Sequence, residues 1–401
     1  MLKFLLLITM LSLPSQQAGA VTIGGTDDRK ADKAKGPMAM FSGDRFDNFR
    51  NMGRYVPTSR MSASPTPWRL AKRFKPLEYS GNFLGKPTSL EQFIALSDSS
   101  AFIVIKDGRI VYETYTNGDS ANSLHMSFSV AKSFTSALTG MAIADGFIEA
   151  VSDPVRKYLP ELTSKTFDGV TIEHVLQMSS GIRFNETYTD PSSDINQMMS
   201  KVPPMSYLEY INTLGQAQKP GTFNHYASIN SQLLGILVSR VTGQSITNYM
   251  TKKLWHPLGM EHDGLWTLDE QGQELTMGGL AASARDYAKL GLLYLNQGKR
   301  GDTQLLSAEW VKASVIPDEP HLMPGKNPGS SNQSGYQYQW WTPKDWDNDY
   351  LARGIWGQNI YVHPKNKVVI VKLAADQKNF DPTYKQAYID YMQDLAQSLT
   401  P

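Results

Sequence analysis

The sequence predicts an α+β protein in which an antiparallel sheet is flanked by helices and carries an inserted, mostly helical domain. Three observations lead to this fold class. Strand hairpins are predicted near residues 101–114 and again near 358–373, far apart in the chain. The segment between them, from 166 to 275, has mostly helical spacing. A sheet assembled from distant segments, with helices between them, accounts for this order of elements.

Domain organisation follows from length and composition. The chain has 401 residues, which is longer than a single domain of about 150 residues. We expect a sheet domain formed by residues 86–165 and 276–401, with the helical insertion domain at 166–275. Residues 21–85 are rich in Gly, Pro, Ser and basic residues and have no clear periodicity. They predict an irregular N-terminal arm that wraps the core or is partly disordered near its start.

The first 20 residues have the features of a signal peptide. Lys3 gives a positive start, Phe4–Leu13 form a short apolar stretch, and Ala18–Ala20 supply small residues for cleavage. The mature protein is then expected to begin near Val21 and to be exported, to the periplasm or out of the cell. The alternative is an uncleaved N-terminal anchor. The apolar run is too short to span a bilayer, so we expect no stable membrane insertion after cleavage.

Composition excludes several classes of partner and cofactor. The net charge of +1, without a block of Lys and Arg, argues against nucleic acid as a partner. The absence of cysteine excludes disulfides, and the seven histidines lack paired ligand spacing, so we expect no metal. Neither a P-loop nor a Gly-x-Gly-x-x-Gly pattern occurs, so we expect no cofactor. The oligomeric state stays open.

In chain order, the first strong element is a hairpin. Residues 101–105 and 109–114 are rich in apolar and β-branched side chains, and the tight turn Asp107–Gly108 separates them. A helix is predicted over residues 129–145, because apolar side chains recur there on one face.

Three further helices and a second hairpin have clear patterns. One helix spans residues 228–241, with an apolar stripe of Leu and Val and with Gly243 as its terminator. Another spans residues 283–296, and the last runs from about 382 to 399. The second hairpin, within residues 358–373, precedes that last helix.

The strongest chemical signal is Ser129-Val-Ala-Lys132, at the start of the first predicted helix. Residues three apart lie on one helix face, so the hydroxyl and the ammonium lie within reach of each other. A serine hydroxyl becomes a good nucleophile only when a base takes its proton. Lysine is such a base when burial and nearby positive charge lower its pKa. The alternative is an N-cap serine beside a surface lysine.

A second signal is the turn-rich loop from Pro220 to Ser228, which leads into the next helix. Tyr226 would be presented at the start of that helix, where a phenol near the serine and lysine can relay a proton. The alternative is a tyrosine packed on the core, with Ser228 as the N-cap. His225, its neighbour, is interpreted as a hydrogen-bonded positioning residue rather than a base.

A third signal is Gly354-Ile-Trp-Gly-Gln358, which opens the second hairpin. Glycine at position 357 would let the backbone approach a ligand closely, and the Gln358 N–H would be an oxyanion donor. The alternative is a simple turn at the start of a strand.

With these motifs in this order, the chain resembles the serine β-lactamase-related hydrolases, a family that also contains penicillin-binding proteins and esterases. The resemblance runs from about Phe93 to the C-terminus. Beyond the three motifs it includes Asp153–Leu162, Thr171–Gly181, Leu233–Gly243, Pro257–Met260 and Gly278–Asp286.

Within that family the chain is most similar to 6-aminohexanoate-dimer hydrolases and related carboxylesterases. The similarity lies in Asn48–Met52, Ser180–Tyr188, His225–Ile229 and Gly357–Val362. The resemblance implies that Ser129 is the acylated nucleophile, Lys132 the base and Tyr226 the proton relay. It also implies an oxyanion hole formed by the backbone N–H groups of Ser129 and Gln358.

Two departures from the family pattern bear on the substrate. Ser228 stands where many β-lactamases of the family have Asn, and Ile355-Trp356-Gly357 stands where Lys-Thr-Gly is usual. The missing cation would meet the carboxylate of a β-lactam or a peptide, so an esterase or linear amidase is favoured. Trp356 would offer an apolar wall to the substrate.

The loop of residues 185–194 carries Tyr188, which could close over the site and contact the substrate; the alternative is a surface tyrosine. Two other functions stay open. One is a β-lactamase or D,D-peptidase that acts on cell-wall peptides, and the other is a catalytically silent scaffold. A small ester or amide is the expected partner.

Overall fold

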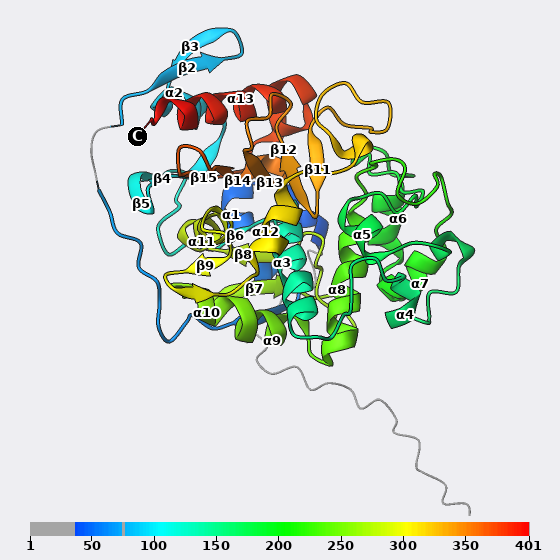
Figure 1. The fold of residues 1–401 in the computed structure, drawn as a ribbon. Helices are drawn as coiled ribbons and strands as arrows, with labels where there is room; N and C mark the ends of the chain where they lie inside the picture. The colour runs from blue at the N-terminus through cyan, green and yellow to red at the C-terminus, as the bar shows by residue number, and fades with distance from the viewer. Residues whose placement is uncertain (1–36, 74–76, 401) are drawn as a thin grey trace, which may run out of the picture.

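The computed structural model describes residues 37–73 and 77–400, so the predicted signal peptide lies outside the described residues. Its centre is a seven-stranded antiparallel sheet in the order β11-β12-β13-β14-β15-β4-β5. The two hairpins predicted from sequence meet in it, because β15 pairs antiparallel with β4. Helices cover the sheet, and α4 to α8 gather on one side of it (Figure 1). The predicted α+β fold class is confirmed.

The helices are α1 (Arg45–Arg50), α2 (Leu90–Leu96), α3 (Ala131–Ala144), α4 (Val155–Tyr158), α5 (Ile172–Leu176), α6 (Asp194–Lys201), α7 (Tyr207–Asn212), α8 (Ser228–Thr242), α9 (Ile246–Met250), α10 (His256–Leu258), α11 (Ala284–Leu295), α12 (Ala308–Val315) and α13 (Pro382–Ser398). The strands are β1 (Thr58–Met61), β2 (Ser80–Phe83), β3 (Lys86–Ser89), β4 (Ser99–Lys106), β5 (Arg109–Tyr115), β6 (His125–Met126), β7 (Gly264–Thr267), β8 (Leu280–Ala282), β9 (Lys299–Arg300), β10 (Thr303–Gln304), β11 (Gly335–Gln337), β12 (Trp340–Thr342), β13 (Tyr350–Gly354), β14 (Gln358–His363) and β15 (Val368–Ala374).

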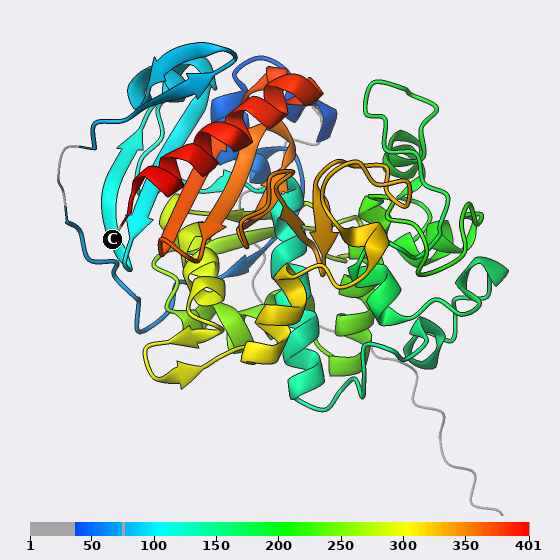
Figure 2. The same cartoon turned by 45° about the horizontal axis from the view of Figure 1, so that its top comes forward.

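The main sheet is covered on both faces. Helix α13 crosses one face, where it contacts β14 and β15 (Figure 2). Helix α11 packs against β14, β15 and β4 from the other side. Strand β15 is buried along its whole length, as expected for a strand between two covered faces.

Helix α3 passes through the interior rather than along the surface. Twelve of its 14 residues are buried, including the polar Lys132 and Ser133. The predicted helix over 129–145 is therefore present with one change, because residues 128–130 form a 3-10 turn before the α-helix begins. Ser129 thus lies in the turn that leads into a buried helix.

The N-terminal arm contains more regular structure than its composition suggested. Helix α1 is capped by the Asp44 side chain, and strand β1 joins a second sheet in the order β1-β7-β8-β6. Strand β6 ends three residues before Ser129, so this sheet helps to position the site. The arm also packs inward, because Phe49 is fully buried against Phe128. These elements have only four to six residues, too few to show a period in the sequence.

Across residues 37–73 and 77–400, no helix combines the length and the apolar character that a membrane crossing requires.

Candidate active site

The predicted nucleophile and base are in contact. The Nζ of Lys132 lies 2.8 Å from the Oγ of Ser129 and donates to the carbonyl oxygen of Met277 at 2.6 Å. Ser129 lies in the 3-10 turn before α3, and Lys132 lies three residues later, in the first turn of α3. Lys132 is only 1% exposed, so water does not compete for its amine. The Ser129 hydroxyl is therefore in contact with a buried amine.

Burial changes the protonation of this amine. It lowers the pKa of Lys132 to about 8, while the carboxylate of Glu186 acts in the opposite direction. Desolvation disfavours the ammonium form, so a substantial fraction of the amine is neutral near pH 8. A neutral amine can accept the serine proton, whereas an ordinary surface lysine is protonated at this pH.

Tyr226 completes the cluster that the sequence predicted. Tyr226 borders the same cavity as Ser129, and the Lys132 Nζ lies 5.2 Å from the centre of its ring. Its ring stacks on Trp341 at 5.1 Å. Burial and the nearby Glu186 raise the pKa of Tyr226 well above its usual value. The phenol therefore keeps its proton and is available as a donor.

Glu186 is a site residue that sequence reasoning missed. It accepts hydrogen bonds from the Ser228 backbone N–H at 2.7 Å, from the Ser228 hydroxyl at 2.5 Å and from the Tyr188 hydroxyl at 2.7 Å. It therefore ties the loop that bears Tyr188 to the first residue of α8. A lone carboxylate in a polar loop is usually solvated, and no pattern in the sequence distinguished this one.

The other predicted residues lie around the same cluster. Tyr188 is 36% exposed, but its hydroxyl points to Glu186. His225 lies next to Tyr226, and its Nε2 contacts the Phe184 carbonyl oxygen at 2.8 Å rather than Ser129.

The backbone of Gly354, the last residue of β13, comes close to Ser129. A Cβ at this position would lie 2.4 Å from the Ser127 carbonyl oxygen and 3.1 Å from the Ser129 nitrogen. The first distance is too short for any side chain, so this close approach requires glycine. The next residue, Ile355, borders the space in front of Ser129.

The expected roles of Gln358 and Gly357 need correction. Gln358 is fully buried in the sheet opposite Gly354, its side chain donates to Ala374, and it borders neither cavity next to Ser129. A Cβ on Gly357 would lie 2.7 Å from the Nζ of Lys372, so this glycine makes room for a buried lysine rather than for a ligand. The close approach to Ser129 is made by Gly354, not by Gly357.

Two cavities meet at Ser129, and both are also bordered by Tyr188 and Ile355. The first, here called the polar cavity, has a volume of about 170 Å³. Residues that distinguish it are Glu186, Tyr226, Trp341, Arg353 and Lys385. The second, the apolar cavity, has a volume of about 330 Å³. Residues that distinguish it are Phe41, Met199, Ser228, Leu275, Trp356 and Phe380.

The polar cavity corrects a second expectation. The absence of a cation at residues 355–357 argued against a charged substrate, but Arg353 precedes the close-approach glycine and borders this cavity. Trp356 does border the apolar cavity, as its predicted role as an apolar wall requires.

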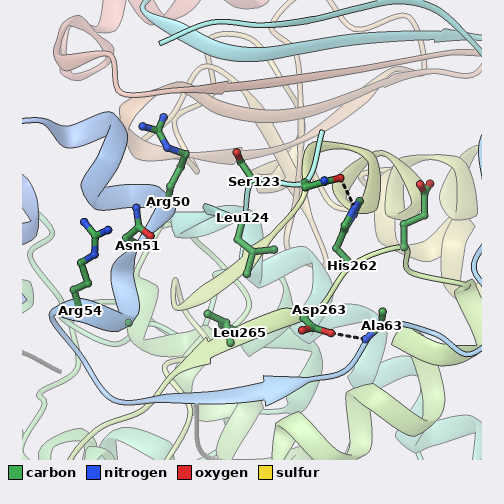
Figure 3. A pocket seen from close by; sticks show the side chains of 12 residues that line it. Arg50, Asn51, Arg54, Ala63, Ser123, Leu124, His262, Asp263 and Leu265 are labelled. Carbon is green, nitrogen blue, oxygen red and sulfur yellow. Dashed lines mark hydrogen bonds between the residues drawn. The ribbon is translucent and has the colours of Figure 1, made fainter. Parts of the chain in front are cut away.

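A larger cavity of about 610 Å³ lies between the arm and the segment of residues 261–265 (Figure 3). Its polar side chains are paired with the protein itself. His262 bonds to Asn122 at 3.0 Å, Asp263 accepts from the Ala63 N–H at 2.8 Å, and Arg54 pairs with Asp47 at 2.6 Å. It has no contact resembling that of Ser129 with Lys132. In the described part of the chain, no group of three or more His, Asp or Glu is placed to hold a metal.

Comparisons with known proteins show which family the chain resembles. A model of the family described as Beta-lactamase matches residues 95–391. The 6-aminohexanoate-dimer hydrolase of Paenarthrobacter ureafaciens is 28% identical over 336 residues, which cover 82% of this chain and 84% of that protein. A beta-lactamase of Escherichia coli (strain K12) is 29% identical over 261 residues, 61% of this chain and 66% of that protein.

Among solved structures, a proposed 6-aminohexanoate-dimer hydrolase from Bacillus anthracis superposes with a TM-score of 0.79 at 23% identity. The match covers 89% of this chain and 96% of that one. At this identity the likeness concerns the fold.

Proposed function

We propose that this chain, which belongs to the beta-lactamase family and is a serine hydrolase, cleaves esters or linear amides through an acyl-enzyme on Ser129. The observation that carries the proposal is the 2.8 Å contact between Ser129 Oγ and the buried Lys132 amine, at the junction of two cavities. A nucleophile beside a base, open to a space of substrate size, is the arrangement that acyl transfer needs.

In the first step, neutral Lys132 takes the proton of Ser129, and Oγ attacks the carbonyl carbon of the substrate. Two backbone N–H groups, those of Ser129 and Ile355, would then stabilise the oxyanion. Ile355 replaces Gln358 in this role because it directly follows Gly354, where an added Cβ would lie only 3.1 Å from the Ser129 nitrogen.

Tyr226 would deliver a proton to the leaving oxygen or nitrogen and recover one from the Lys132 ammonium. Its raised pKa and its place beside Ser129 on the polar cavity support this role. The acyl group stays on Ser129 until water, activated by the same groups, attacks it. The acid is then released, and the Ser129 hydroxyl and the Lys132 amine are restored.

The apolar cavity supports an acyl chain of aliphatic or aromatic character. Phe41, Trp356 and Phe380 border it, and the ring centroids of Trp356 and Phe380 lie 5.2 Å apart. Tyr188, between the two cavities, would contact the bound substrate. Ser228 acts there mainly by holding Glu186.

A second candidate function is cleavage of β-lactams or D,D-peptides. Arg353 in the polar cavity favours it, since both substrate classes carry a carboxylate near the scissile bond. Export to the periplasm or beyond also belongs to the proposal, and it rests on residues 1–20, which are outside the described residues.

The test is a substrate panel combined with mapping of the covalent intermediate. We expect turnover of p-nitrophenyl butyrate and of the linear 6-aminohexanoate dimer to exceed that of nitrocefin and a D-Ala-D-Ala peptide. A fluorophosphonate should add its mass to the peptide that contains Ser129. Efficient nitrocefin hydrolysis without ester or amide turnover would favour the second candidate, and a label on another residue would refute the assignment of Ser129.

The pH dependence of kcat/KM tests the base. Protonated Lys132 cannot accept a proton, so kcat/KM for p-nitrophenyl butyrate should fall about tenfold per pH unit below about 8 and level off above it. Glu186 raises this pKa, so Glu186→Gln should move the midpoint to lower pH.

The matched control is Asp190→Asn, which removes another carboxylate of the same loop. Its midpoint should stay at the wild-type value. A midpoint that rises in Glu186→Gln, or that moves equally in both variants, would contradict the assignment of Lys132 as the titrating base.

A further inference from the structure

Glu186 is the acidic side chain of the polar cavity, and it is the sole carboxylate among the residues that border it. Ser129 and Tyr226 border the same cavity, whose volume of about 170 Å³ has room for a few water molecules. Burial lowers the pKa of Lys132 and raises that of Tyr226, and the Glu186 carboxylate raises both. The transfer of the acyl group to Ser129 gives this carboxylate no role of its own.

The protein holds this carboxylate in one orientation and leaves part of it free. Glu186 is partly buried. Its Oε1 atom accepts from the hydroxyls of Tyr188 and Ser228, and its Oε2 atom accepts from the Ser228 backbone N–H. An ionised carboxylate has about four acceptor positions, so Oε2 keeps a second one. This position can accept a hydrogen bond from a water in the polar cavity.

The order of the two half-reactions places the hydrolytic water in this cavity. Tyr226 borders the polar cavity and is absent from the lining of the apolar one. A group that protonates the leaving atom lies on the leaving-group side of the scissile bond, so the leaving group departs through the polar cavity. Deacylation is acylation in reverse, with water in place of the leaving group. The water therefore occupies the space that the leaving group has vacated, while the acyl chain stays in the apolar cavity.

The other polar side chains of this cavity are less suited to hold a water by its proton. The guanidinium of Arg353 can only donate, and the amides of Asn332 and Asn379 are weaker acceptors than an ionised carboxylate. Tyr226 keeps its proton, because burial and the Glu186 carboxylate raise its pKa, and its hydroxyl is therefore available as a donor. Glu186 is the acceptor of this cavity that carries a negative charge.

Resting on the proposed hydrolase function, we propose that Glu186 binds the water that releases the acyl group from Ser129. The water donates one proton in a hydrogen bond to Oε2 of Glu186 and the other to the neutral amine of Lys132. Lys132 takes this second proton as the water oxygen forms its bond to the acyl carbonyl carbon. The bond from that carbon to the Ser129 Oγ then breaks, and Oγ takes the proton from the Lys132 ammonium, 2.8 Å away. The product acid keeps the first proton until it ionises in solution.

The test is pre-steady-state kinetics of Glu186→Gln with p-nitrophenyl butyrate, at a pH above the pKa of Lys132, which burial lowers to about 8. Without the charged acceptor for water, deacylation should slow about 100-fold, while acylation should stay within about threefold of wild type. The variant should release one equivalent of p-nitrophenol in a burst and then turn over slowly. Intact-protein mass spectrometry should find one butyryl group on the accumulated enzyme, at Ser129.

Two further readouts separate the binding of water from a structural role of Glu186. The kcat of Glu186→Gln should be the same for phenyl and p-nitrophenyl butyrate, since both esters form the same acyl-enzyme. Formate should speed deacylation in Glu186→Ala, because it returns a carboxylate to the cavity. Asp190→Asn is the control: it removes a carboxylate of the same loop that accepts from Ser192, and it should leave both rates unchanged. Melting temperatures of all variants confirm folding.

The outcomes are distinguishable. If Glu186→Gln slowed acylation and deacylation by the same factor, or slowed neither, the water would not be bound by Glu186, and the hydrolase function would stand. Slow deacylation that formate leaves unchanged in Glu186→Ala would likewise overturn the role in water binding and assign the loss to the loop. If the wild-type protein formed no acyl-enzyme on Ser129, the proposed function itself would be wrong, and the water site with it.

Discussion

Lys132→Met should lower kcat/KM for p-nitrophenyl butyrate by about 10⁴-fold, and Ser129→Ala should lower it by a similar factor. The reason is that the two side chains act as one unit: without the amine, the hydroxyl keeps its proton, and without the hydroxyl, the amine has nothing to activate. Methionine has a similar length and fills the buried space that the lysine occupies. The double variant should therefore be no slower than either single variant.

The measurement is steady-state kinetics on all three variants, with fluorophosphonate labelling rates as a second readout. Ser133→Ala is the matched control, because Ser133 is a buried serine of the same helix whose hydroxyl donates to the Gln339 carbonyl oxygen. It should lower the melting temperature while kcat/KM stays within about threefold of wild type. If Lys132→Met retained more than a hundredth of wild-type activity, another residue would be the base.

Long, strongly patterned elements could be predicted from the sequence to within a few residues. Helix α8 begins at Ser228 and ends before Gly243, which adopts a left-handed φ of +65° as a C-terminal glycine commonly does. The hairpin β4–β5 turns at Asp107–Gly108, both with positive φ. In these cases the signal is local, because residues close in sequence determine the element.

The residues that sequence reasoning misplaced depend on long-range contacts. Gly354 and Gly357 look equivalent in the sequence, and only the pairing of β13 with β14 decides that the first faces Ser129. Arg353 was overlooked for the same reason. Glu186 belongs to the site only because its loop folds back onto the start of α8.

Backbone strain at the residues next to Ser129 and Ile355 links the N-terminal arm to the site. Phe128 and Trp356 have positive φ angles of 46° and 64°, a conformation that bulky residues rarely adopt. The ring of Phe49, from the arm, packs 5.0 Å from Phe128 and 5.7 Å from Trp356. Such strain persists where packing holds it. Helix α1 thus helps to maintain the turns that present Ser129 and Ile355.

Gly354→Ala should lower kcat by about 10²- to 10³-fold, the cost of losing one oxyanion donor. The new Cβ would lie 2.4 Å from the Ser127 carbonyl oxygen and 3.1 Å from the Ser129 nitrogen, so the end of β13 must move away from the nucleophile. That movement separates the N–H groups of Ser129 and Ile355. Its φ of −125° suits alanine, so the loss comes from the contact and not from backbone strain.

Substitutions at two other glycines test whether the loss of kcat is specific to Gly354. Gly215→Ala is the control, since its Cβ would meet only Arg183 at 3.9 Å, and kcat should stay near wild type. Gly357→Ala places a Cβ against Lys372 at a φ of +89°, so its melting temperature should fall more than its kcat does. Kinetics and thermal melts of the three variants separate the two effects. If Gly357→Ala abolished turnover while Gly354→Ala did not, the second donor would lie at residues 357–358, where the sequence alone had placed it.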